Sequence, residues 1–187
     1  FSMTKAAARA EPDAGHPFLC FLNTVADDGK SRGQNSFSDA HELRGQMQAA
    51  GLSLPSDIDA QMQALMGLRE AAYVAFSALA AGRIPKPEDG LTLAAAMQSV
   101  MAEAELRITP QGLLTMPRPL ARAYDLVVLS MEDLLRSDQF ARLRECRRCT
   151  HLFLDQGRGV GRRWCSMARC GNRAKAENFR ARQRDAA

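Results

Sequence analysis

Residues 146–170 read CRRCTHLFLDQGRGVGRRWCSMARC, and their cysteine spacing specifies how this part of the chain folds. A tetrahedral Zn2+ site needs four soft ligands, and two close cysteine pairs supply them when the loop between them folds back as a hairpin. Residues 150–155 have strand character, the glycine-rich residues 156–161 favour a turn, and residues 162–164 return the chain to the second pair. We therefore predict a zinc site on a β-hairpin, with four ligands: Cys146, Cys149, Cys165 and Cys170.

The predicted zinc ion is structural. The residues from 140 onward contain the single tryptophan of the chain and few aliphatic side chains, so an ion that binds only the folded form would contribute most of their folding free energy. Four thiolates leave no open position for water, which argues against hydrolysis at the metal. A reducing compartment disfavours disulfides, and a thioredoxin-like pair needs a βαβ frame that the sequence pattern lacks. His151 is an alternative ligand, but we expect it on the hairpin surface.

Charge is distributed unevenly along the chain. Residues 140–187 contain 13 basic residues (Lys and Arg) and 4 acidic residues (Asp and Glu), which give a net charge of +9. Residues 1–139 contain 12 basic and 17 acidic residues, which give a net charge of −5. Four of the five cysteines also lie in the basic part. We therefore predict a domain boundary near residue 140, with a regulatory domain at 1–139 and a zinc module at 140–187.

The composition excludes some classes of protein. With 187 residues, of which 46% are apolar, the chain is long enough to bury a core in one or two small domains. Its longest nearly apolar stretch, residues 71–81, is shorter than the roughly 18 residues that a membrane span requires. No basic segment followed by a long apolar core marks the chain for secretion. We expect a bacterial-type cytoplasmic protein with no membrane partner.

Residues 1–139 are expected to be mainly helical, because apolar residues recur there at intervals of three and four. The expected elements are a helix from Ser38 or Asp39 to Ala50, helices over 56–81, 87–104 and 119–135, and a β-hairpin of 105–109 and 113–116 with its turn at 110–112. The predicted fold is thus mainly α with a short β-hairpin, followed by a small four-cysteine zinc module made of a β-hairpin and a helix.

A basic helix is predicted after the third cysteine, with Ser166 or Asn172 as its N-cap. At 100° per residue, one stripe of four arginines falls within an arc of about 60°, and a lysine and an arginine form a second stripe. The first stripe is Arg169, Arg173, Arg180 and Arg184, and the second is Lys175 and Arg182. Like charges so close repel each other, which indicates an anionic partner on this face.

DNA is the predicted partner, because guanidinium groups contact phosphate and guanine edges in a major groove that admits a helix. Arg158, Arg162 and Arg163 add positive charge from the hairpin, as do Arg147 and Arg148. The alternative is a solvated, arginine-rich tail. RNA is less supported, because the aromatic side chains that would stack on bases are expected to form a small core around the metal. Those side chains are Phe153, Trp164 and Phe179.

These residues also carry a family resemblance. The stretch RRWCSM at 162–167, followed by CGNR at 170–173 and by Lys175, resembles the CGNR zinc-finger family over about residues 143–184. The resemblance implies four cysteine ligands and DNA binding in bacterial transcription regulators. The chain departs from the family in the hairpin tip, where residues 156–161 replace the Ser-Arg-Asn that members often carry.

The first part of the chain resembles the helical domain that usually accompanies this finger, a stress-responsive regulatory or ligand-binding domain. The likeness lies in Phe18 to Val25 and in Leu43 to Leu52. Asn23 and Thr24 are candidate ligand-binding residues within it. Their alternative role is to form capping or turn hydrogen bonds.

Two functional classes remain open. The preferred class is a transcription regulator whose helical domain senses a small molecule or forms a homodimer, while the zinc module binds DNA. The alternative is a redox-responsive zinc-thiolate or protein-interaction module without direct DNA binding. An enzyme is not expected, because the sequence has no phosphate-cradling glycine loop and no nucleophile elbow, and its three histidines are scattered.

Overall fold

The computed structural model describes residues 14–26, 29–110, 112–117, 121–157 and 161–185. Its helices are α1 (Pro17–Leu22), α2 (Ala40–Ala49), α3 (Met62–Ala80), α4 (Pro87–Met101), α5 (Ala123–Arg136) and α6 (Asn172–Asp185). Its strands are β1 (Glu105–Thr109), β2 (Gly112–Met116), β3 (Leu143–Glu145) and β4 (Leu152–Leu154). The prediction of a mainly α fold with a small β-hairpin is confirmed. None of the helices in these ranges is long and apolar enough to cross a membrane.

The helix boundaries follow from local hydrogen bonds. Asp39 begins α2, because its carboxylate accepts a hydrogen bond from the backbone N–H of Glu42 at 2.8 Å. Gly51, with a φ of +89°, follows the helix in the left-handed conformation that glycine adopts readily. At α5, the Asp125 carboxylate accepts from the backbone N–H of Arg122 at 3.0 Å. The predicted helix over 119–135 therefore begins only at Ala123, and residues 118–120 lie outside the described ranges.

The helix predicted over 56–81 begins later than expected. Residues Ile58–Gln61 form a short 3-10 helix, and α3 starts only at Met62. A tertiary contact explains the difference: the Gln61 side chain accepts a hydrogen bond from the backbone N–H of Tyr124 at 3.0 Å and so caps α5. Helix α4 also ends at Met101 rather than at residue 104. The hairpin of β1 and β2 forms as predicted, with Thr109 opposite Gly112.

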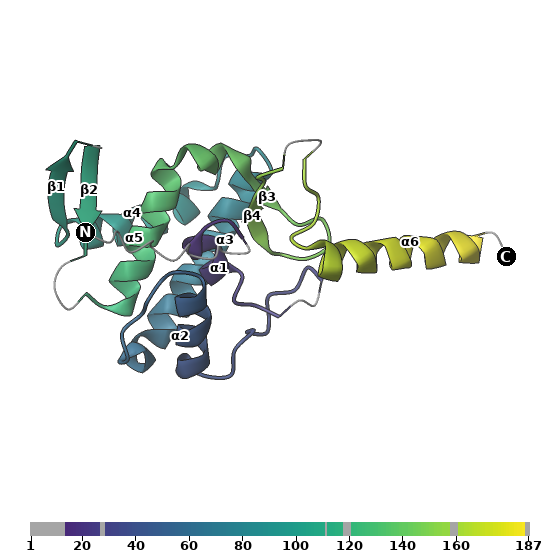
Figure 1. Cartoon of the computed structure of the whole chain (residues 1–187), viewed down its shortest axis with the longest axis horizontal. Coiled ribbons are helices and arrows are strands. Elements are labelled where there is room, and N and C mark those ends of the chain that lie inside the picture. The colour runs from purple at the N-terminus through teal and green to yellow at the C-terminus, as the bar shows by residue number, and fades with distance from the viewer. Residues whose placement is uncertain (1–13, 27–28, 111, 118–120, 158–160, 186–187) are drawn as a thin grey trace, which may run out of the picture.

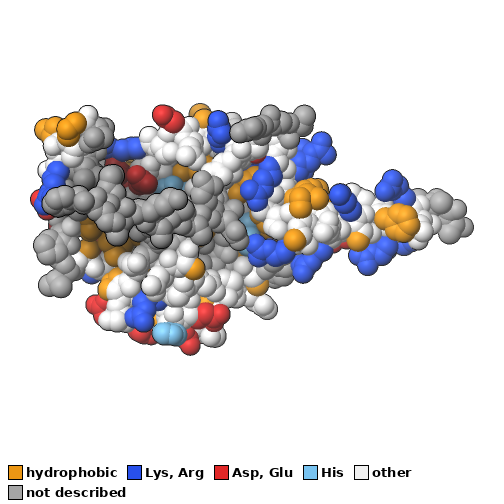
Figure 2. All heavy atoms as spheres, viewed as in Figure 1, with side chains coloured by type: hydrophobic (Ala, Val, Ile, Leu, Met, Phe, Trp, Pro, Cys, Tyr) orange, Lys and Arg blue, Asp and Glu red, His pale blue; other side chains and the backbone are white. Residues whose placement is uncertain are grey.

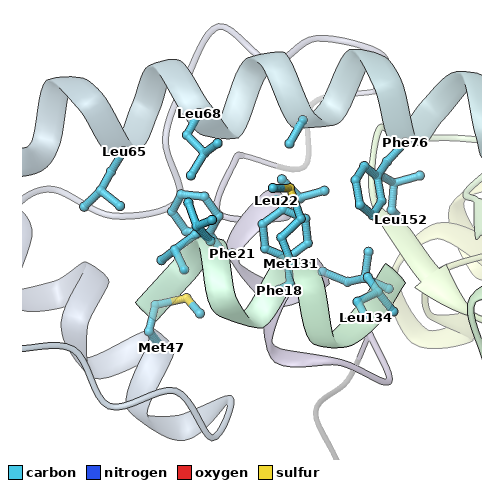
Figure 3. Close-up of a cluster of buried hydrophobic side chains, with 14 of the residues drawn as sticks. Phe18, Phe21, Leu22, Met47, Leu65, Leu68, Phe76, Met131, Leu134 and Leu152 are labelled. Carbon is cyan, nitrogen blue, oxygen red and sulfur yellow. The ribbon is translucent and has the colours of Figure 1, made fainter. Parts of the chain in front are cut away.

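The main core is built around α1, the shortest α-helix in the described part of the chain (Figures 1 and 3). Phe18, Phe21 and Leu22 of α1 are fully buried. The rings of Phe18 and Phe76, from α3, have centroids 5.3 Å apart, and Met131 of α5 packs into the same cluster. Each of these side chains contributes roughly 1.5–3 kcal/mol by leaving water.

Strand β4 connects this core to the cysteine cluster. Successive side chains of a strand point to opposite faces, and β4 uses both faces. Leu152 and Leu154 belong to the main core, and Figure 3 shows Leu152 beside Phe76. Phe153 between them belongs to a second, smaller cluster that contains the cysteines. The helical part and the zinc module thus pack on the two sides of one strand, and a boundary near residue 140 stays a prediction.

Candidate metal centre and basic surface

The first cysteine pair lies in the turn of a β-hairpin. Strands β3 and β4 are antiparallel, with Leu143 opposite Leu154, so Cys146 and Cys149 lie in the segment that connects them. The predicted pairing of residues 150–155 with residues 162–164 is wrong, because 162–164 form no strand. The Cys-x2-Cys turn is itself short enough to reverse the chain, so β4 pairs with the strand that precedes the turn. Residues 158–160, which include Arg158 and belong to the tip where the chain departs from the family, lie outside the described residues.

The four predicted ligands come together in one cluster. Their sulfur atoms all lie within 4.8 Å of one another. The Cys149 Sγ lies 3.6 Å from the Cys165 Sγ and 3.5 Å from the Cys170 Sγ, and the last two are 3.6 Å apart. Four sulfurs placed tetrahedrally at about 2.3 Å from an ion would lie about 3.8 Å apart. The donor chemistry and the spacing fit Zn2+, and no disulfide joins these cysteines.

Four thiolates placed this close together repel one another unless a cation lies between them. Cys146, Cys149 and Cys170 are buried, whereas Cys165 is partly exposed. The hydrogen bond that Cys165 donates to the Cys146 thiolate, together with burial, raises the pKa of Cys165 to about 12. A bound Zn2+ offsets this penalty by stabilising the deprotonated sulfurs. The cluster is therefore a zinc site in which the metal joins the hairpin turn to the start of the terminal helix.

The aromatic residues near the cluster only partly match the prediction. Phe153 is fully buried against the cysteines and Trp164 packs beside them, while the Arg162 guanidinium lies 4.5 Å from the centre of the Phe153 ring. Phe179 is 55% exposed, so its predicted place in this small core is wrong. Helix α6 leaves the body of the protein before it reaches Phe179 (Figure 1).

The sequence predicts His151 on the hairpin surface, but the structure buries this residue. The residue is only 7% exposed, and it lies at the end of the turn, directly before β4. Its backbone carbonyl accepts a hydrogen bond from the backbone N–H of Cys146 at 2.9 Å. His151 is thus part of the turn that presents the first two sulfurs, and it is not among the clustered ligands.

Ser166 is the N-cap of the helical segment that carries the fourth ligand. Its hydroxyl accepts a hydrogen bond from the backbone N–H of Arg169 at 3.4 Å. Residues Met167–Gly171 form a π-helical turn that continues into α6 through Asn172. A Cβ atom at Gly171 would lie 3.2 Å from the Trp164 ring and would displace the Met167 side chain. The glycine after the fourth cysteine therefore permits close packing on the tryptophan.

A lysine from the helical part holds the zinc turn, although no local sequence pattern indicates it. The Lys30 ammonium group donates hydrogen bonds to the backbone carbonyls of Cys146 and Cys149, each at 2.8 Å. It also pairs with the Glu145 carboxylate at 2.5 Å, whose other oxygen accepts from the Ser77 hydroxyl. Because 115 residues separate Lys30 from Glu145, no local pattern could reveal this contact.

An arginine network fixes the loop that carries Lys30. Arg32 pairs with Glu70 of α3 at 2.8 Å, and its guanidinium lies 3.9 Å from the centre of the Tyr73 ring. The buried Arg69 pairs with the same carboxylate and donates to the backbone carbonyl of Thr24 at 2.8 Å. Burial by itself would raise the pKa of Glu70, but the two guanidinium groups lower it overall. The loop is thereby tied to α3.

Asn23 and Thr24 make structural hydrogen bonds. The Asn23 amide donates to the Leu152 carbonyl and accepts from the Leu152 N–H, both at 2.8 Å, so it pairs with the edge of β4. The Thr24 hydroxyl donates to the Phe21 carbonyl at 2.7 Å, which is a turn hydrogen bond of the kind expected. Asn23 also lines a cavity, described below. A ligand-binding role for the two residues stays a prediction.

Helix α6 extends from the zinc cluster away from the rest of the protein (Figure 1), and Glu177 of α6 pairs with Arg148 of the zinc turn at 3.0 Å. Within it, Ala174 is buried, and from Lys175 to Arg184 every residue except the partly exposed Ala181 is exposed. Figure 2 shows Lys and Arg side chains along this helix and around its base. Several of the predicted cations have side chains that form no ion pair or hydrogen bond with the described residues: Arg169, Lys175, Arg180 and Arg184. Arg169 lies in the π-helical turn, so the predicted 60° arc describes only the other three arginines.

Two arginine-lined hollows lie beside the cysteine cluster. One has a volume of about 300 Å³ and is bordered by Arg144, Arg147, Arg162 and Arg163. The other has a volume of about 340 Å³ and is bordered by Arg162, Ser166 and Arg169. The Arg162 guanidinium donates to the carbonyls of Trp164 and Cys165, which fixes it between the two hollows. The zinc module therefore presents positive charge from its hairpin as well as from α6.

The structure is that of a helical part joined to a four-cysteine zinc module with a basic terminal helix. Residues 15–138 match the ABATE family, described as "Putative stress-induced transcription regulator", and residues 142–183 match the CGNR zinc finger. The first match spans more than half of the chain, so the protein belongs to the ABATE family and carries a CGNR zinc finger. Neither description is that of an enzyme. No curated protein matches the chain.

Proposed function

We propose that the protein is a transcription regulator that binds DNA through its zinc module. The observation that carries this proposal is the row of exposed cations on α6, which extends from a base fixed by the cysteine cluster. Like charges along one face destabilise an isolated helix, and DNA phosphates would offset that repulsion. The helical part, residues 1–139, acts as a sensing or dimerisation domain.

The dimensions of α6 suit the major groove of DNA. Its 14 residues span about 21 Å, and a major groove about 12 Å wide admits an α-helix. Arginines on α6 would then contact phosphates or guanine edges, while Arg147 and Arg163 beside the cysteine cluster contact the backbone. A tail without the zinc-bound base would carry the same charges but would not present them in one direction.

A homodimer is proposed for the helical part. Leu106 and Ile108, two residues apart on β1, are 53% and 91% exposed. Alternate residues of a strand lie on the same face, so the two side chains form one apolar patch on the β1–β2 hairpin. This hairpin lies at the end of the molecule opposite to α6 (Figure 1), so contact between two copies there would leave both basic helices accessible.

Neutralising two α6 arginines is expected to weaken DNA binding without unfolding the protein. The double variant Arg173→Gln, Arg180→Gln should lose between about 10- and 100-fold in affinity at about 0.1 M salt, because each lost phosphate contact removes about 0.9 from the slope of log K against log salt concentration. The measurement is binding to a pool of genomic DNA fragments over a series of salt concentrations.

The matched control removes the same charge from the helical part, as the double variant Arg44→Gln, Arg83→Gln. This control should keep the wild-type affinity and slope. If the α6 double variant also keeps both, α6 is not the DNA-binding helix.

A further inference from the structure

A cavity lies at the junction between the helical part and the zinc module. Its volume is about 360 Å³, within the range of small-molecule sites, which often lie between domains. Ala14, Cys20, Val25 and Ala26 form its apolar wall, and Cys20 and Ala26 are partly exposed. We call it the junction cavity. Its walls come from the loop after α1, from α2 and from two segments of the zinc module, one at β4 and one that contains Cys165 and Arg169.

Three neutral polar side chains of the junction cavity already have protein partners. The Asn23 amide is paired with the backbone of Leu152. Ser36 and Gln46 are hydrogen-bonded to each other, with the Ser36 hydroxyl 3.1 Å from the Gln46 Oε1 and the Gln46 amide 3.0 Å from the Ser36 carbonyl. These groups therefore have little capacity left to select a ligand.

The charge of the junction cavity comes from one side chain. Arg169 is the only Lys, Arg, Asp or Glu among the described residues that line it, and its side chain forms no ion pair or hydrogen bond with the described residues. A guanidinium beside an apolar wall matches a carboxylate attached to an apolar body. We infer that the junction cavity binds a small organic carboxylate, with Arg169 holding the carboxylate and the apolar wall holding the rest.

Arg169 gives this site a regulatory consequence, which rests on the proposed function. The same residue borders the arginine-lined hollow beside Arg162 and immediately precedes the fourth zinc ligand, Cys170. A carboxylate bound in the junction cavity would occupy the guanidinium that otherwise faces DNA phosphate. The ligand and DNA therefore bind with negative coupling, which is reciprocal by linkage.

The test uses 2-naphthoate as the probe and the uncharged 2-naphthamide as its matched analogue, with the zinc-loaded full chain. Calorimetry should show naphthoate binding at least about tenfold more tightly than naphthamide, because only naphthoate pairs with a guanidinium. Arg169→Gln should remove this preference, Arg169→Lys should retain part of it, and Arg83→Gln, which removes a distant charge, should leave it intact. Equal binding of the two probes, or an unchanged preference in Arg169→Gln, would overturn the inference.

A second readout locates the probe. Cys20 lines the junction cavity, is partly exposed and is not in the zinc cluster. Naphthoate should slow the alkylation of Cys20 by iodoacetamide several-fold, and an unchanged rate would place the probe elsewhere and contradict the site. Saturating naphthoate should also weaken DNA binding by the wild type. If the protein binds no DNA at any salt concentration, the proposed function fails, whereas the calorimetry and alkylation still decide the carboxylate site.

Discussion

Replacement of Cys149 by serine is expected to abolish zinc binding and to unfold the zinc module. The Cys149 side chain is 1% exposed, and its sulfur lies within 3.6 Å of those of Cys165 and Cys170. Structural zinc contributes about 10–16 kcal/mol to the folding of isolated zinc-finger peptides. The small cluster around Phe153 and Trp164 cannot supply that free energy by burial alone.

Metal analysis and tryptophan fluorescence measure this effect. Trp164 is the only tryptophan of the chain and packs beside the cysteines, so its emission reports on the zinc module alone. Wild-type protein should contain one zinc ion per chain, and Cys149→Ser should contain none and show red-shifted emission. Cys20→Ser, a cysteine outside the cluster, is the control and should match the wild type. Stoichiometric zinc and unshifted emission in Cys149→Ser would refute the four-cysteine site.

Truncation of Leu152 is expected to destabilise both parts of the protein together. Leu152 is fully buried in the main core, and its backbone is paired with Asn23 on the edge of β4. Leu152→Ala leaves a cavity beside Phe76 (Figure 3) and should lower the free energy of unfolding by about 2–5 kcal/mol. Because the next residue of β4, Phe153, contacts the cysteine cluster, the loss should reach the zinc module.

Urea unfolding followed by two probes checks this prediction. Far-ultraviolet circular dichroism reports on the helices and Trp164 fluorescence reports on the zinc module. Both midpoints should fall by the same amount in Leu152→Ala, while Ile108→Ala, at a site 91% exposed, should change the free energy of unfolding by less than about 0.5 kcal/mol. A fall seen by circular dichroism alone would show that the two parts unfold independently across β4.

Local chemistry explains what the sequence could predict. The four cysteines were identifiable because metal ligands need a particular element and spacing, whatever the backbone between them does. Helices α2, α3 and α4 were recognisable from apolar periodicity and from local stop signals such as Gly51. The basic helix was identifiable because its charges lie within one short segment.

Long-range contacts explain the errors. The choice of β3 as the partner of β4 depends on the tightness of the turn at Cys146, which spacing alone does not reveal. His151 is buried because it lies at the end of that turn, directly before β4. Phe179 is exposed because it lies on α6, which extends away from the rest of the protein. Lys30 and Asn23 hold the zinc hairpin from sites more than 100 residues away in the chain.

One comparison of DNA affinities distinguishes the effect of the zinc-held geometry from the effect of charge alone. Genomic fragments are first selected with the zinc-loaded wild type, and the same fragments are then titrated with protein before chelation, after chelation and after zinc is restored. The structure predicts that chelation lowers the affinity by about a thousandfold, to the level of non-specific binding, and that zinc restores it. Equal affinities for the loaded and the zinc-free protein would show that α6 acts as a charged tail and that the metal does not position it.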